Sequence, residues 1–155
     1  MPCNVINNPS FETGALDGWY ASTGNVANIV QGTIAHAGNY YLDVTGTAEV
    51  PQVSVAQDLY WLDDENEHTL TLWVRVADPI PSTGHCEVSA YLGEDPEAGA
   101  IASDFVWHAD EWIQLTGSIQ PLARDLTLHF IGSCVDAGKE VPAHILFDDV
   151  VLSDC

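Results

Sequence analysis

The sequence predicts an all-β fold, an antiparallel β-sandwich. Apolar and polar residues alternate over many short runs, and Gly, Pro, Asn and Asp separate these runs. No stretch keeps its apolar residues at the helical period, which argues against helices. A chain of 155 residues suits one hydrophobic core. We therefore expect a single sandwich domain over residues 1–155.

The opening segment, residues 4–19, is expected to anchor this fold. The short apolar run Val5–Ile6 begins a strand, and Pro9 ends it because proline has no N–H to donate. Glu12 directly follows the apolar Phe11, which places a carboxylate beside the core. An ordinary surface loop does not need Phe11, Glu12 and Trp19 at these spacings.

Alternating runs predict the strands that follow. In residues 68–76, Leu72 and Val74 share one face, and Trp73 and Arg75 share the other, because successive strand side chains point to opposite faces. The expected strands cover residues 25–30, 38–44, 53–59, 68–76, 86–92, 105–107, 112–119, 126–134 and 145–152.

Several of these segments together resemble the carbohydrate-binding modules of the four, nine and twenty-two type. Residues 4–19 resemble their opening, N-x-I/V-x-N-x-x-F-E-x-G-x-L-x-G-W. Residues 68–76 resemble Y-T-L-S-F-W-V-R-A, residues 111–117 resemble E-W-x-x-L-x-G, and residues 145–152 resemble I-x-x-D-D-V-x-L. The similarity spans nearly the whole chain. It implies a galactose-binding-like jelly roll and non-catalytic glycan binding.

The charge and the absent motifs exclude several functions. The net charge is -20, with only three basic residues. Such a surface repels phosphate backbones and anionic membranes, so neither nucleic acid nor a membrane is an expected partner. No apolar run reaches membrane-spanning length, and no signal peptide is visible. The acidic residues cluster in turns and no common catalytic motif occurs, so no enzyme activity is expected.

The four cysteines predict two disulfides. None has C-x-x-C spacing, and an even count in a small acidic domain is typical of an oxidising, secreted setting. Cys3 flanks the first strand and Cys155 follows the last, and the two termini meet in this fold. Cys86 and Cys134 share inward parity on strands expected to be neighbours. We therefore expect the pairs Cys3–Cys155 and Cys86–Cys134.

Two acidic residues lie against apolar neighbours. Glu12 follows a core phenylalanine, and Asp148 has the strand parity of Leu146, Val150 and Leu152, so it points inward if they do. A lone inward carboxylate is costly unless it is paired or binds a cation. The chain has too few basic residues to pair them all, so Ca²⁺ with oxygen ligands is the natural solution.

The family resemblance implies the same structural calcium. It would bind between Glu12 and Asp148, and backbone carbonyls that map to Ser10 and to the turn from Thr33 to His36 would complete its coordination. Asp149 is an alternative ligand. The competing interpretation is that both carboxylates cap backbone N–H groups without a cation.

A glycan site needs an aromatic plate for the apolar face of a sugar ring, with polar groups for its hydroxyls. Four residues lie on parities opposite the core and would form such a surface if their strands share one sheet: Trp73, Arg75, Tyr91 and His129. Related modules often carry a stacking aromatic where this chain has residues 47–51, which contain none, and Trp107 could substitute from a loop. The competing interpretation is that Trp73 and Tyr91 merely cover the sheet.

The predicted function is therefore non-catalytic binding of a neutral polysaccharide or its oligosaccharides, by a secreted monomer with a structural calcium. The alternative is an extracellular structural or adhesion domain with the same fold and no sugar site.

Overall fold

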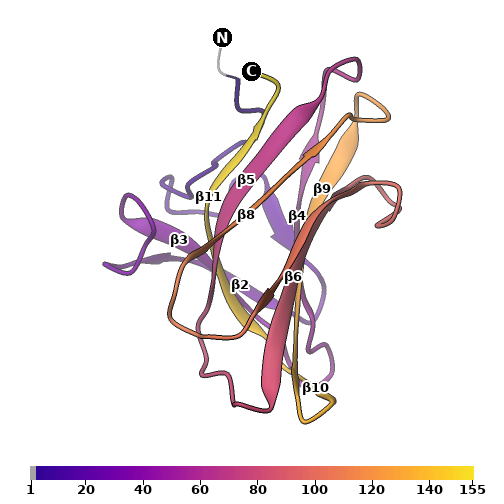
Figure 1. Cartoon of the computed structure of the whole chain (residues 1–155). Coiled ribbons are helices and arrows are strands. Elements are labelled where there is room, and N and C mark those ends of the chain that lie inside the picture. Colours follow the sequence, from indigo (N-terminus) through magenta and orange to yellow (C-terminus); the bar gives the residue numbers. More distant parts are fainter. Residues whose placement is uncertain (1–2) are drawn as a thin grey trace.

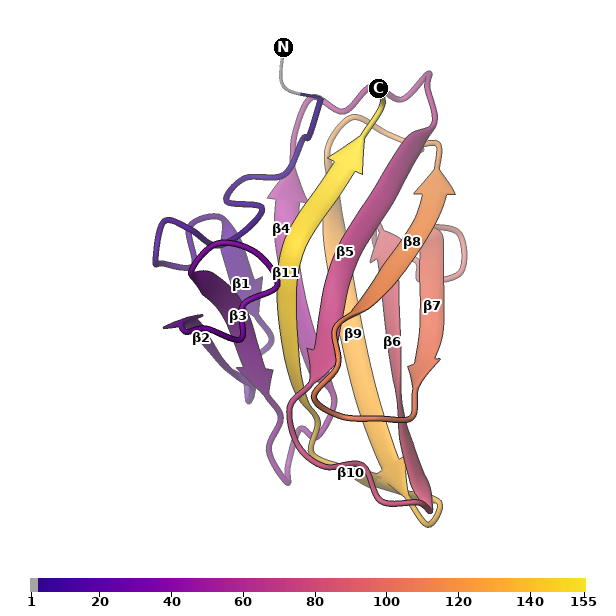
Figure 2. The same cartoon turned by 60° about the vertical axis from the view of Figure 1, so that its left-hand side comes forward.

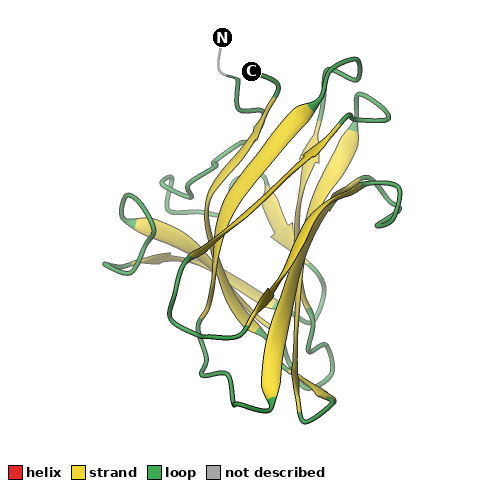
Figure 3. Cartoon of the chain, viewed as in Figure 1, coloured by secondary structure: helices red, strands yellow, loops and turns green. Residues whose placement is uncertain are grey.

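The computed structural model describes residues 3–155 and contains strands but no helix in this range (Figures 1 and 3). No segment of residues 3–155 is therefore a helix that could cross a membrane. The strands are β1 (Trp19–Ala21), β2 (Val26–Gln31), β3 (Tyr40–Thr45), β4 (Val53–Leu59), β5 (His68–Val76), β6 (Gly84–Leu92), β7 (Ala100–Val106), β8 (Ile113–Ile119), β9 (Leu126–Asp136), β10 (Lys139–Val141) and β11 (His144–Ser153).

The strands form two antiparallel sheets that pack face to face (Figure 2). Sheet A has the order β2-β3-β11-β5-β8. Sheet B has the order β1-β4-β9-β6-β7, with β10 paired to β9. The predicted all-β, antiparallel sandwich of jelly-roll type is confirmed.

The core lies between the inner faces of the two sheets. Phe130 of sheet B stacks on Phe147 of sheet A, with ring centroids 5.8 Å apart. Gly132 lets the sheets approach, because a Cβ at this position would collide with the Ile145 side chain. The alternating pattern thus predicted the buried face of most long strands, with β7 and β11 as the exceptions.

The opening segment anchors the fold as expected. Trp19 is only 4% exposed, and its indole N–H donates to the backbone carbonyl of Asn8. The amide of Gln57 pairs with both backbone groups of Asn7, at 2.8 and 2.9 Å. These bonds satisfy a buried amide and tie the segment to β4.

Both predicted disulfides are present. Cys3–Cys155 joins residues 152 positions apart, and the N and C labels lie close together at one end of the sandwich (Figure 1). Cys86 of β6 and Cys134 of β9 stand directly opposite each other, and both are buried.

Four elements differ from the sequence prediction. The strand expected to begin at Val5–Ile6 was wrong, because this segment forms only an isolated bridge between Asn4 and Ser153. Strand β7 runs over Ala100–Val106, so the expected strand at residues 105–107 was wrong in extent. Most of β7 is exposed at the sheet edge, so it lacks the alternation that marks a half-buried strand. The three-residue strands β1 and β10 were not predicted because they are too short to show a period.

The expected inward direction of Asp148 was also wrong. Phe147 pairs with the core residue Val74, so its neighbours Leu146 and Asp148 point to the outer face of sheet A. The register then shifts at a bulge after Asp148, where Asp149 has a φ of 49°. One extra residue in a strand reverses the faces that follow, and this returns the next apolar residues to the core.

Candidate functional site

The structure separates the four predicted glycan-binding residues into two pairs. Trp73 and Arg75 lie on β5 of sheet A, whereas Tyr91 and His129 lie on β6 and β9 of sheet B. The expectation of one shared surface is therefore wrong. Strand parity places a side chain outside the core, but it does not say which sheet carries the strand.

The outer face of sheet A is covered by the β2–β3 loop. The ring of His36 stacks on Trp73, with centroids 4.1 Å apart and planes 18° apart. The indole N–H of Trp112 donates to the carbonyl of Ile34 at 2.8 Å and holds the loop down. The apolar face of Trp73 is therefore occupied by a protein ring and is not free to stack on a sugar.

Arg75 lies beside this covered region. Its side chain is 18% exposed, its guanidinium is 3.5 Å from Asp110, and its Nε is buried without a hydrogen-bond partner among residues 3–155. Nearby, the His144 ring lies between Asp43 at 2.9 Å and Asp78 at 3.1 Å. Burial alone would lower the pKa of His144, but hydrogen bonds to the two carboxylates outweigh it and raise the pKa.

The outer face of sheet B carries an open aromatic pair. Tyr91 and His129 stand directly opposite each other on neighbouring strands, and their rings stack 4.5 Å apart at 14°. Burial lowers the pKa of His129 despite the nearby carboxylates of Glu94 and Asp58. The imidazole is therefore mainly neutral at pH 7.

Hollows flank this pair on both sides. One of about 460 Å³ leads toward β1, and one of about 450 Å³ leads toward β7. Tyr91 lines both hollows, and we call the two together the sheet-B groove. Its lining residues are Tyr20, Ala21, Ser22, Thr23, Ser54, Ala56, Ser89, Ala90, Tyr91, Pro96, Ala100, Ile101, Ala102, Ser103, His129 and Ile131. Sequence reasoning missed its serine and alanine lining, because such small residues carry no distinctive pattern.

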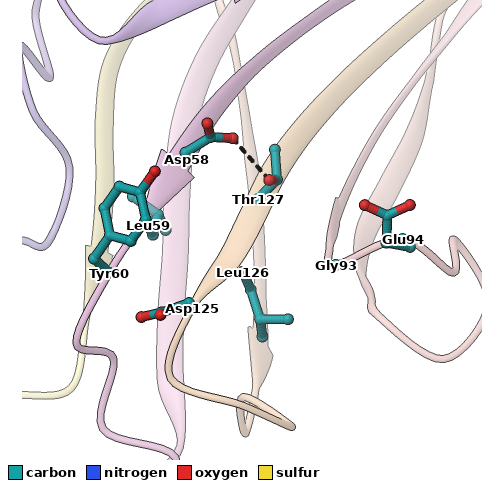
Figure 4. A pocket seen from close by; sticks show the side chains of 8 residues that line it. All are labelled: Asp58, Leu59, Tyr60, Gly93, Glu94, Asp125, Leu126 and Thr127. Carbon is teal, nitrogen blue, oxygen red and sulfur yellow. Dashed lines mark hydrogen bonds between the residues drawn. The ribbon is translucent and has the colours of Figure 1, made fainter.

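A third hollow, of about 280 Å³, opens farther along β4 and β9 (Figure 4). One oxygen of Asp58 accepts hydrogen bonds from the hydroxyls of Tyr20 at 2.7 Å and Thr127 at 2.8 Å. The bond from Tyr20 and then that from Thr127 lower the pKa of Asp58, so this carboxylate is ionised. The hollow therefore adds negative charge beside the groove.

A second aromatic cluster occupies the other end of β6 and β7. The ring of His85 lies 5.5 Å from Phe105 and 4.9 Å from Trp107. Trp107 is 57% exposed and follows the last residue of β7. The loop aromatic considered from the sequence is thus exposed, but it does not line the groove.

The two carboxylates among the predicted calcium ligands, those of Glu12 and Asp148, both bind backbone N–H groups. The carboxylate of Glu12 accepts from the N–H groups of Asn39 and Tyr40, each at 2.9 Å. The carboxylate of Asp148 accepts from Asp149 N at 2.9 Å and Ala37 N at 3.3 Å. Both acids therefore fix the end of the β2–β3 loop, as the competing interpretation expected.

The chemistry of these groups nevertheless suits a hard cation. Asp148 is fully buried, and burial raises its pKa to about 6. Asp149 accepts from the Ser10 hydroxyl at 2.7 Å and contacts His36 at 2.6 Å. Within residues 3–155, no three His, Cys, Asp or Glu side chains converge as a preformed metal cluster. The calcium roles of Ser10, Glu12, Thr33, His36 and Asp148 remain predictions.

Several solved structures with a similar architecture are carbohydrate-binding modules. The CBM22-1 xylan-binding domain of Paenibacillus barcinonensis Xyn10C is 17% identical over 93% of this chain and 90% of that chain, with a TM-score of 0.69. TmCBM61, in complex with β-1,4-galactotriose, is 16% identical over 98% of this chain and 99% of that chain, with a TM-score of 0.64. At such identities the likeness establishes the fold. No curated protein matches the chain.

The sequence itself carries the family signature. A family model described as "Carbohydrate binding domain" matches residues 3–131, which is most of the chain. This match confirms the resemblance seen in the sequence motifs, and it assigns the chain to binding and not to catalysis. The chain therefore belongs to the carbohydrate binding domain family.

Proposed function

We propose that the sheet-B groove binds a neutral polysaccharide or its oligosaccharides. The observation that carries this proposal is the stacked pair Tyr91 and His129, which lies between two hollows. Each ring of this pair covers one face of the other, so the apolar plate for the CH face of a sugar is the outward face of a ring, toward the hollow that it lines. The hydroxyls of Ser54 and Ser89 line the hollows on either side and can hydrogen-bond sugar hydroxyls.

The charges around the groove favour a neutral ligand. Asp58 and Glu94 lie beside it, whereas Arg75 belongs to sheet A, Arg124 to the β8–β9 loop and Lys139 to the short strand β10. Uronic-acid or sulfated glycans would meet carboxylates without a basic partner in the groove lining. Neutral sugars avoid this repulsion.

The structural relatives suggest which neutral glycans to test. One is a xylan-binding domain, and another is a complex with β-1,4-galactotriose. Both support a polysaccharide ligand and make xylan and β-1,4-galactan suitable first probes.

A structural calcium is the second part of the proposal. Glu12 and Asp148 would hold the ion, with Asp149 as an alternative ligand, and the carbonyls of Ser10 and of the turn at Thr33–His36 would complete its coordination. When bound, the ion supplies positive charge that neutralises a buried carboxylate. The ion would stabilise the β2–β3 loop. Because this loop lies on the sheet-A side and the groove lies on sheet B, the role of the ion would be structural.

The disulfides agree with secretion, so the protein is proposed to act outside the cell as a monomeric, single-domain module.

Affinity gels of xylan and β-1,4-galactan test the groove. Tyr91→Ala and His129→Ala should each lose retention, because the aromatic plate is removed while the core is untouched. Trp107→Ala is the matched control, since Trp107 is an exposed aromatic residue in the loop directly after β7 and lies outside the groove lining. Equal retention of Tyr91→Ala and the parent would place the site elsewhere. If the parent binds neither gel nor other neutral glycans, the structural or adhesion alternative takes over.

A further inference from the structure

The β4–β5 loop presents a tryptophan to solvent away from the groove. Trp61 is 86% exposed, and the preceding residue, Tyr60, is 64% exposed; Leu122 of the β8–β9 loop is 76% exposed. Trp61 also has a φ of 61°, in the left-handed region that bulky residues rarely adopt. A strained backbone conformation lowers the free energy of unfolding, and such conformations cluster at binding sites.

Contacts to the β8–β9 loop hold this tryptophan in place. The N–H of Trp61 donates to the Asp125 carboxylate at 3.2 Å. The next residue, Leu62, is only 2% exposed and donates its N–H to the carbonyl of Arg124 at 2.8 Å. The backbone under the indole is thus fixed on both sides, which lowers the entropic cost of binding a ligand there.

Polar groups surround the indole. A hollow of about 220 Å³ is lined by Trp61, Leu62, Asp63, Asp64, Glu65 and Arg124. The Arg124 guanidinium is 67% exposed and lies 3.8 Å from Asp64, which is too long for a hydrogen bond. Its donors and the Asp64 carboxylate are therefore available to a ligand. Asp63 is already engaged by Glu65 N and the Asn66 amide.

We propose that this hollow is a second carbohydrate-binding site, for one pyranose residue of a neutral glycan. Trp61 stacks on the CH face of the ring, Arg124 donates to ring hydroxyl oxygens, and Asp64 accepts from a hydroxyl. A hollow of this size, with donors and an acceptor at its wall, suits a single sugar ring better than the broad apolar patch that a protein partner requires.

The second site is distinct from the groove but close to it. Tyr60 lines the third hollow on sheet B, and Trp61 is the next residue. The ligand class rests on the family assignment, and the position does not depend on the proposed groove. Two sites on one chain let a long polysaccharide bind at both, so retention should fall more on a polymer than on a short oligosaccharide when either is lost.

Tryptophan indole N–H signals in NMR spectra of the full chain provide the test. The probes are xylohexaose and β-1,4-galactotriose, each titrated into the parent and into Tyr91→Ala. Trp61→Gly identifies the Trp61 signal and removes the ring, and glycine tolerates the positive φ. Leu122→Ala is the matched control, because Leu122 is similarly exposed but does not line the hollow.

The second site predicts a saturable shift of the Trp61 signal in the parent, in Tyr91→Ala and in Leu122→Ala. Arg124→Ala should weaken that titration about tenfold. An unmoved Trp61 signal with both sugars overturns the second site, whether or not Tyr91 and His129 respond. A shift that vanishes in Tyr91→Ala makes Trp61 an end of the groove and overturns an independent site. A shift that depends on protein concentration without sugar indicates self-association, which also overturns it.

Discussion

The outer faces of sheet A and sheet B begin from the same alternating pattern and end differently. On sheet A, His36 covers Trp73, and Asp148 is completely buried. On sheet B, Tyr91 and His129 stack on an open face between two hollows. The difference shows that alternation decides which side chains leave the core, whereas the loops decide which of them reach solvent.

The covered face contributes to stability, and the open face is free for a ligand. The bulge in β11 places Asp148 on the outer side of sheet A, where it binds the N–H of Ala37 in the covering loop. Within residues 3–155, hollows and not a covering loop lie beside the stacked pair on sheet B. Substitutions on the two faces should therefore separate stability from binding.

The largest expected effect concerns the core that both faces share. Replacing Cys86 and Cys134 with alanine removes a cross-link of 48 residues, which should lower the free energy of unfolding by about 4 kcal/mol on the chain-entropy model. Glycan retention at low temperature should persist, because the pair is buried beneath sheet B and does not line the groove. Chemical unfolding and gel retention measure the two. If the folded variant no longer binds to the glycan gel, the groove would depend on the disulfide, which would contradict the separation of stability from binding.

Removing calcium should have the next largest effect, confined to sheet A. An ion at 100 times its dissociation constant adds about 2.7 kcal/mol to the free energy of unfolding if it binds only the folded state. EDTA should therefore lower the melting temperature, and Glu12→Gln should abolish most of this chelator effect. Retention by the folded protein should not change. An identical melting curve with EDTA, and no metal by elemental analysis, would rule the ion out.

Trp73→Ala sharpens the comparison further. Removing a half-buried indole from under His36 should lower the free energy of unfolding by about 2 kcal/mol, roughly half the loss for a fully buried tryptophan. Retention on glycan gels should equal that of the parent. Arg75→Ala should likewise act on stability, because its side chain lies mostly buried on the same face. Weaker retention without a loss of stability would return the binding site to sheet A.

The sequence predicted the features that repeat or that lie close together along the chain. Alternation located most of the long strands, and the opening motif indicated the buried Trp19. The cysteines gave both disulfides because Cys3 and Cys155 lie near the two ends of the sequence, which were expected to meet in this fold, while Cys86 and Cys134 share a parity. These are local signals, so they survive without knowledge of the tertiary arrangement.

The site depended on information that is not local. Which strands share a sheet is set by long-range pairing, so Trp73 and Tyr91 could not be separated by parity. The bulge after Asp148 leaves no mark in a run of apolar residues, and it reversed the predicted direction of that carboxylate. The cover of His36 over Trp73 depends on how a loop folds across a sheet.

The smallest expected effect is the opposite pH response of one histidine on each face. The pKa of His144 on sheet A lies above its ordinary 6.5, because bonds to Asp43 and Asp78 outweigh burial, whereas burial lowers the pKa of His129 on sheet B. His144 thus contributes stability below pH 6.5 that is lost as the pH rises through its folded pKa. His129 contributes stability above pH 6.5 that is lost as the pH falls through its folded pKa.

NMR titration of the histidine ring protons should therefore give midpoints on opposite sides of 6.5 for these two residues. Each contribution to the slope of unfolding free energy against pH stays below about 1.4 kcal/mol per pH unit, the limit for one proton. His144→Gln should remove the loss of stability above neutral pH and leave retention intact, because His144 lies on the sheet-A side. His129→Gln should remove the acid-side loss and weaken retention, because its ring is half of the stacked plate. Midpoints on the same side of 6.5 would mean that the two faces do not differ electrostatically as the side-chain contacts indicate.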